Sequence, residues 1–281
     1  MDYWSYAWTD DPIVSGLISH SGNVFSFPIN SNDLAQQHWY SAASLLGCAS
    51  SGDVMPCMRN KSFTDIKAAA RQVKPPPNTS VARSQPVFQP TPDNKTVWAD
   101  YTDLSYNGKF AKIVRDRLCE SATQTNLHRS QPYLAGNTHN EAGFYKISAY
   151  AQGNILTDTQ WDEFNAQDFI CPTAVEAINR AKFGVPTWRF CYFGDWDNLR
   201  LYPTSGAYHG SDLEMIFGAS EDVSGLPKSD AEQLTRAVMM RAWAAFANDS
   251  QRGLSEVMGW PEYDENSMMS PIPSHVREEH R

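Results

Sequence analysis

The chain has 281 residues, and its 23 Lys and Arg against 32 Asp and Glu give a formal net charge of −9. Hydrophobic residues make up 41% and aromatics 12%, which excludes a disordered chain and suffices for one large domain or two small ones. The acidic balance argues against a nucleic-acid partner, because surfaces that bind phosphates carry clustered Lys and Arg. The longest apolar run, 242–247, falls far short of the about 20 residues of a membrane span.

The sequence carries secretory marks without a secretory start. Its N-terminus lacks the charged and apolar regions of a signal peptide. Five cysteines are too few for a disulfide-dense scaffold, and their odd number leaves at least one thiol free. We therefore expect that the front of a secreted protein is missing. Four N-x-Ser/Thr sequons, against roughly two expected by chance, are glycosylation candidates: Asn60, Asn78, Asn94 and Asn248.

Hydrophobic periodicity predicts an α/β chain, in which short apolar strands alternate with amphipathic helices. In chain order we expect a helix at 3–8, a strand at 13–18, helices at 32–46 (with Asn32 as N-cap) and 63–73, a Pro-rich surface linker at 74–92, a strand at 132–135, a helix at 161–182, a strand at 187–193 and a helix at 230–248. The strand at 13–18 is apolar on both faces, which is typical of the interior of a parallel sheet. The last helix is the clearest, with an expected apolar face of Leu234, Val238, Ala242, Ala245 and Phe246.

Two polar loops follow predicted strands, at 136–144 (GNTHNEAGF) and 206–214 (GAYHGSDLE). Ligands of open α/β sheets bind beyond the carboxyl ends of the strands, where such loops lie. The first loop offers Glu141 and the second His209, and a carboxylate behind a histidine fixes its tautomer and stabilises the imidazolium. The chain order matches Ser…Asp/Glu…His hydrolases if a serine comes earlier. On these residues alone, a solvated glutamate and a structural histidine remain the alternative.

Several motifs together resemble the type-B carboxylesterases, the family of cholinesterases and fungal lipases, with the fungal members closest. They are GAYHGSDLEMIFG at 206–218, GNTHNEAGFY at 136–145, the opening DYWSYAWTDDPIVSGLISHSGN and Gly-Trp-Pro near Trp260. The resemblance implies that 1–281 is one partial domain, the C-terminal portion of an α/β-hydrolase fold with a mostly parallel sheet flanked by helices. It also implies a carboxylic ester hydrolase that is secreted when intact, acts on a small-molecule or lipid ester, and needs no cofactor.

The same resemblance implies roles for individual residues. The catalytic acid falls on Glu141, the catalytic histidine on His209, and Ser21 on a serine that supports them, with a turn serine as the alternative reading. Cys48 and Cys57 match a disulfide loop of the family. The other histidines show no metal-ligand spacing, so we expect no metal site.

The chain also departs from the family. The nucleophile elbow G-x-S-x-G and a Gly-Gly oxyanion motif are both missing, and the family places the elbow just before Met1. Ser5 is a poor substitute, because it lies on the helix that follows the elbow. We therefore expect a C-terminal fragment that is inactive by itself. The alternative is a non-catalytic or degenerate relative that acts, if at all, as a binding protein.

A second departure is the polar segment 114–130, which is either a surface loop insertion or a translated intron. It contains Cys119, whereas Cys171 and Cys191 are expected to be buried free thiols, with a disulfide between them as the alternative. Without the preceding strands of the family fold, the strand at 13–18 would form an exposed sheet edge, through which we expect self-association.

Overall fold

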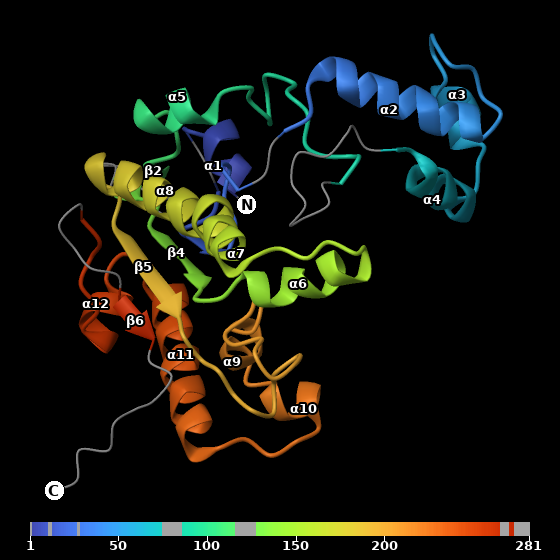
Figure 1. Ribbon diagram of the computed structural model, residues 1–281. Coiled ribbons are helices and arrows are strands. Elements are labelled where there is room, and N and C mark those ends of the chain that lie inside the picture. The colour runs from blue at the N-terminus through green and yellow to red at the C-terminus, as the bar shows by residue number, and fades with distance from the viewer. Residues whose placement is uncertain are drawn as a thin grey trace, which may run out of the picture. The chain divides into compact units, whose positions relative to one another are not determined.

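The computed structural model divides the chain into two compact units, Met1–Phe27 with Asp100–Arg281, and Pro28–Ala99 (Figure 1). It describes residues 2–10, 13–26, 29–74, 86–115, 128–264 and 270–272. Most of the expected Pro-rich linker (75–85) and of the expected insertion (116–127) therefore lies outside the described residues.

The larger unit is built on a parallel sheet. Among the described residues its order is β1 (Leu17–His20), β4 (Tyr133–Thr138), β5 (Thr187–Tyr192) and β6 (Ser270–Ile272). Every neighbouring pair is parallel, with Leu17 opposite Tyr133 and Tyr133 opposite Thr187. A separate antiparallel pair joins β2 (Ile113–Arg115) to β3 (His128–Ser130), so the start and end of the expected insertion meet as two strands.

Helices cover both faces of this sheet (Figure 1). Trp188, Phe190 and Tyr192 of β5 pack in one core with the inner side of α11 (Asp230–Asn248) and with α12 (Gly253–Met258). Tyr133 of β4 points the other way, where the Arg180 guanidinium of α8 (Cys171–Lys182) lies 4.3 Å from its ring centroid. Because both faces are covered, all six residues of β4 and of β5 are buried, as expected for an interior parallel strand.

Shorter helices complete the larger unit: α1 (Asp2–Ala7), α5 (Tyr101–Tyr106), α6 (Ala142–Ala151), α7 (Asp158–Asn165), α9 (Leu213–Ile216) and α10 (Ser220–Ser224). The helix expected at 161–182 is present but begins earlier, where Thr157 and Gln160 form a capping box. It also contains a π-helical segment, η1 (Ala166–Ile170), between α7 and α8. Such segments insert an extra residue into a helix and are frequent at functional sites.

The strand expected at 13–18 is wrong in its boundaries, since β1 covers only 17–20. Ile13 is exposed and has φ +66°, which a strand does not allow. The surroundings of Gly16 explain why strand pairing begins only at Leu17. A Cβ there would lie 2.9 Å from Ser250 and 3.2 Å from the Phe246 ring, so the chain passes close to the end of α11 before it enters the sheet.

Two further expectations need correction. The strand expected at 132–135 continues to Thr138, because β4 lies between two partners and keeps its register with β5 through Thr138. Helix α11 has the expected limits, but Leu234 and Val238 are exposed, and the buried face is instead formed by Glu232, Thr235, Met239, Ala242, Trp243, Ala245 and Phe246. Because Thr235 and Glu232 are polar, the pattern of apolar residues alone does not reveal this buried face.

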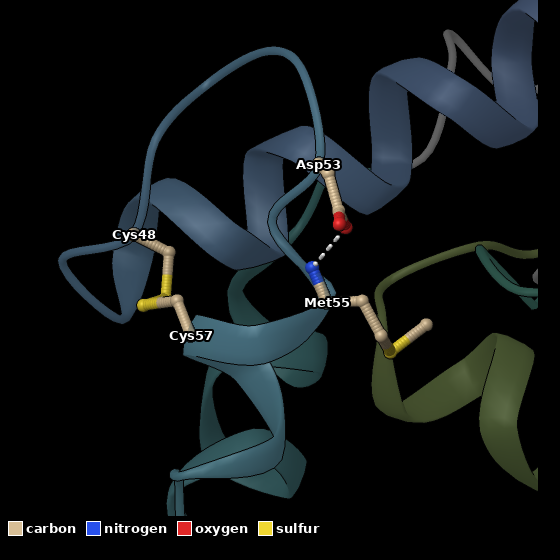
Figure 2. Close-up of a disulfide and its surroundings, with 4 residues drawn as sticks. All are labelled: Cys48, Asp53, Met55 and Cys57. Atoms are coloured by element: carbon tan, nitrogen blue, oxygen red, sulfur yellow. Dashed lines mark hydrogen bonds between the residues drawn. A yellow bond between two sulfur atoms is a disulfide. The ribbon is translucent and has the colours of Figure 1, made fainter.

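The smaller unit is helical, with α2 (Asn32–Leu45), α3 (Met55–Arg59) and α4 (Phe63–Gln72). The N-cap of α2 is Ser31 rather than Asn32, since its hydroxyl accepts from the backbone N–H of Leu34. The disulfide between Cys48 and Cys57 is present, with Cα atoms 6.0 Å apart (Figure 2). It ties the end of α2 to α3 across a loop in which Asp53 accepts from the N–H of Met55.

Candidate active site

The loops after β4 and β5 bring Glu141 and His209 together, although 68 residues separate them. The imidazole Nδ1 of His209 lies 2.6 Å from Oε2 of Glu141, whose residue is 0% exposed. A backbone contact joins the two loops directly, because the N–H of Asn140 donates to the carbonyl of Ala207 at 3.0 Å. This main-chain hydrogen bond holds the two loops together, and the two side chains with them.

The second carboxylate oxygen of Glu141 is also occupied. Its Oε1 accepts from the Ser21 hydroxyl and from the backbone N–H of Thr138, both at 2.6 Å. Two such donors hold the carboxylate in one orientation. Glu141 is thereby aimed at His209 by groups from two neighbouring strands.

Ser21 reaches Glu141 because the backbone turns sharply at the end of β1. The residue has φ +51°, in the left-handed region that non-glycine residues seldom adopt. Its N–H continues the sheet pairing by donating to the carbonyl of Gly136 at 2.8 Å. The turn directs the hydroxyl toward the buried carboxylate, so Ser21 is placed beside the Glu141–His209 pair.

Aromatic rings surround the imidazole of His209. The ring centroids of Tyr145, Phe169 and Phe144 lie 5.2, 5.3 and 6.2 Å from it. Phe169 belongs to the π-helical segment η1, and Asn165 just before it accepts from the N–H of Ala142 at 2.7 Å. Neither Phe169 nor Asn165 could be predicted as a neighbour of His209, because helical periodicity does not reveal an inserted residue.

A carboxylate hydrogen-bonded to one nitrogen of an imidazole is an arrangement that can support proton transfer. With Nδ1 bound to Glu141, the Nε2 atom of His209 is the nitrogen left to accept a proton from a reacting group. Within the described part of the chain, the hydrogen bond found at this imidazole is the one between Nδ1 and Glu141. The structure therefore brings Glu141, His209 and Ser21 together.

Ser5 is unsuited to that role. It is 0% exposed, its hydroxyl donates to the carbonyl of Asp2 at 2.8 Å, and it accepts from the guanidinium of Arg180 at 2.7 Å. A serine used in this way is part of a buried ion-pair cluster and cannot approach a substrate.

The remaining sequence candidates are the sequons and the cysteines outside the disulfide. Asn60, Asn94 and Asn248 are exposed, as a glycan requires, while Asn78 and Cys119 lie outside the described residues. Cys191 is buried, which raises the pKa of its thiol to about 12. Cys171 is exposed, contrary to expectation, because it begins α8 on the side away from buried Pro172 and Thr173.

Two further features are absent from the described residues. No helix there has the length and apolar character needed to cross a membrane. No group of three or more His, Cys, Asp or Glu side chains in that part of the chain could hold a metal ion.

Solved structures of esterases resemble this one over almost its whole length. A PNB esterase matches 96% of this chain and 57% of its own with a TM-score of 0.68 at 19% identity. A thermophilic PNB esterase matches 97% and 56%, with a TM-score of 0.70 at 17% identity. The fold is that of the α/β hydrolases.

Sequence relatives of this α/β-hydrolase chain are fungal enzymes, whereas no family model matches it. It is 30% identical over 254 residues to a chlorogenic acid esterase of Aspergillus niger, covering 89% of this chain and 43% of the relative. It is 27% identical over 270 residues to secreted lipase 5 of Gibberella zeae, covering 93% and 46%. The chain thus spans less than half the length of the curated relatives that it matches.

Proposed function

We propose that this chain carries the acid and the histidine of a carboxylic ester hydrolase of the type-B carboxylesterase kind. The observation that carries the proposal is the buried Glu141 carboxylate, held by two donors and placed 2.6 Å from Nδ1 of His209. Its fungal relatives are named an esterase and a lipase. Such a pair on this fold has one well-understood use, the activation of a hydroxyl nucleophile.

In the proposed reaction, Nε2 of His209 takes the proton of a nucleophilic serine as its oxygen attacks the ester carbonyl. The same imidazolium then gives the proton to the departing alcohol, and a water molecule later releases the acid by the reverse sequence. Glu141 keeps the Nδ1 proton in place and stabilises the imidazolium. Ser21 and the Thr138 N–H keep Glu141 in position throughout.

The serine and the oxyanion-hole donors are proposed to lie in the part of the relatives that this chain does not match. More than half of each curated relative's length remains there, and no G-x-S-x-G occurs in this sequence. We propose an ester of a small molecule or a lipid as substrate, and an extracellular location with glycans at the exposed sequons. Both proposals follow the names of the two relatives.

The test compares the chain alone with a fusion to the unmatched N-terminal part of the Aspergillus relative. The chain alone should not hydrolyse p-nitrophenyl acetate or react with a serine-directed phosphonate, whereas the fusion should do both. In the fusion, His209→Ala should lower kcat by about 10³-fold or more, as loss of a triad member does. Glu141→Gln should also lower it, while Glu163→Gln, at an exposed glutamate of α7, should not.

A second candidate is ligand binding without turnover, which the lack of a G-x-S-x-G elbow in this sequence favours. It would be supported by a fusion that binds an ester analogue but shows no turnover. Turnover and phosphonate labelling by the chain alone would contradict both candidates as stated, and would mean that it holds its own nucleophile.

A further inference from the structure

A second histidine–carboxylate pair lies directly beside the first. Nδ1 of His20 is 2.6 Å from Oδ2 of Asp212. His20 is the last residue of β1 and precedes Ser21, and Asp212 follows His209 by three residues. The two pairs therefore connect the same two loops, one through Ser21, Glu141 and His209 and the other directly.

The surroundings of His20 fix which nitrogen carries its proton. The indole N–H of Trp243 donates to Nε2 of His20 at 2.9 Å, so Nε2 is an acceptor. The proton therefore sits on Nδ1 and is donated to Asp212. The rings of Phe190 and Trp243 pack against the imidazole, each with its centroid 5.3 Å away. With both nitrogens engaged, His20 has no free position for a substrate proton.

Asp212 in turn depends on His20. Its residue is 1% exposed, and its other oxygen, Oδ1, has no hydrogen-bond partner among the described residues. Its neighbour Glu214 is also acidic and offers no positive charge to compensate it. The N–H of His20 is thus the hydrogen bond that keeps this buried carboxylate, and the loop that bears it, in place.

We propose that His20 and Asp212 are positioning residues, which hold the 209–212 segment so that the His209 imidazole stays aligned with Glu141. The inference rests on the function proposed above for His209. At its 209 end the segment is linked to Ser21 through Glu141, and at its 212 end it is bound directly to His20. A loop tied only at His209 could turn about that contact, whereas two ties separated by three residues fix its direction.

The test uses NMR of the chain labelled with 15N-histidine, in which long-range nitrogen–proton correlations report the protonated nitrogen of each ring. His209→Gln and His20→Gln assign the two signals. In the unsubstituted chain, both rings should be protonated at Nδ1 with slowly exchanging protons. Asp212→Ala should abolish the slow exchange of the His209 Nδ1 proton, although Glu141 and His209 are unchanged. Asp212→Asn should restore it, because its amide oxygen can still accept from His20.

Asp197→Ala is the matched control, since that aspartate has a side chain that is 91% exposed, and it should leave both signals unchanged. If Asp212→Ala does not fold, the double variant His20→Phe with Asp212→Leu replaces the pair without leaving a buried charge unpaired. It should cause the same loss at His209. An unchanged His209 signal in a folded variant of either kind would overturn the inference. A His209 that lacks the Nδ1 proton already in the unsubstituted chain would instead contradict the function proposed for it.

Discussion

Single residues in the loop around His209 experience strong electrostatic effects from burial and from neighbouring charges. Glu214 lies five residues beyond His209, and its Oε2 atom is buried without a partner among the described residues. Burial, followed by the charges of Asp212 and Glu232, raises the pKa of its carboxyl from 4.5 to about 7. The proximity of three carboxylates thus makes this loop sensitive to pH.

We expect the free energy of unfolding to fall as the pH rises from about 4.5 to about 7, because the folded chain keeps a proton on Glu214 that the unfolded chain has lost. Glu214→Gln stays neutral and should remove this part of the slope. At pH 8 the variant should be more stable than the original chain by on the order of 1–2 kcal/mol, after allowance for partial exposure. Urea unfolding at pH 4, 6 and 8 measures it.

Glu163→Gln is the control at an exposed position, and its pH profile should match that of the original chain. A Glu214→Gln profile parallel to the original from pH 4 to 8 would show that the carboxyl titrates normally.

At the scale of elements, helix α8 is held to its neighbours by a buried ionic cluster. Arg180 donates to Glu176 at 2.6 Å within α8 and to Asp2 of α1 at 2.7 Å. Its guanidinium also lies over the rings of Tyr133 and Phe110. Burial raises the pKa of Glu176 most, and the negative charge of Asp2 raises it further, whereas the positive charge of Arg180 lowers it. One side chain thus joins two helices and the sheet.

Arg180→Met should destabilise the folded chain by about 3–5 kcal/mol, because it leaves two buried carboxylates without their cation. The comparison is Arg200→Met, which removes ion pairs with Asp195 and Asp197 at the surface and should cost about 1 kcal/mol or less. Thermal and urea unfolding measure both. Equal losses in the two variants would mean that burial of the Arg180 cluster adds nothing.

Elements differed in how well the sequence predicted them. Helix α11 has the predicted ends because Ser229 caps it and no competing signal interrupts it. The Glu141 and His209 loops were found through motifs, since spacing alone does not show that residues 68 positions apart meet. The start of β1 was missed, because packing of α11 against Gly16, and not local propensity, decides where pairing begins. The π-helical segment, which contains Phe169, depends on tertiary packing and leaves no periodic pattern in the sequence.

At the scale of the whole molecule, the sheet edge at β1 is the feature that most affects association with other chains. Among the described residues β1 pairs on one side alone, with β4. Exposed apolar residues directly precede β1 in the chain, since Ile13 is 67% and Val14 39% exposed. An unprotected edge with apolar neighbours favours pairing with other chains.

We expect the isolated chain to self-associate, with an apparent size in light scattering that grows with protein concentration. Val14→Lys should reduce the association, because a charge beside an edge strand opposes pairing. Ile155→Lys, at a position that is 80% exposed but distant in sequence from β1, is the control and should have less effect. A monodisperse monomer with a sharp unfolding transition would contradict the expectation.

The parallel pairing of β1 with β4 also sets a time scale for synthesis. Leu17 is opposite Tyr133, so 133 − 17 = 116 residues separate the partners. At about 5–20 residues per second, a ribosome needs roughly 6–23 s to make that stretch. During this interval the apolar residues of β1 have left the ribosome without the strand that will cover them. A chaperone that binds short apolar segments would therefore find Leu17 and Ile18 uncovered during this interval, and would have to release them once β4 emerges.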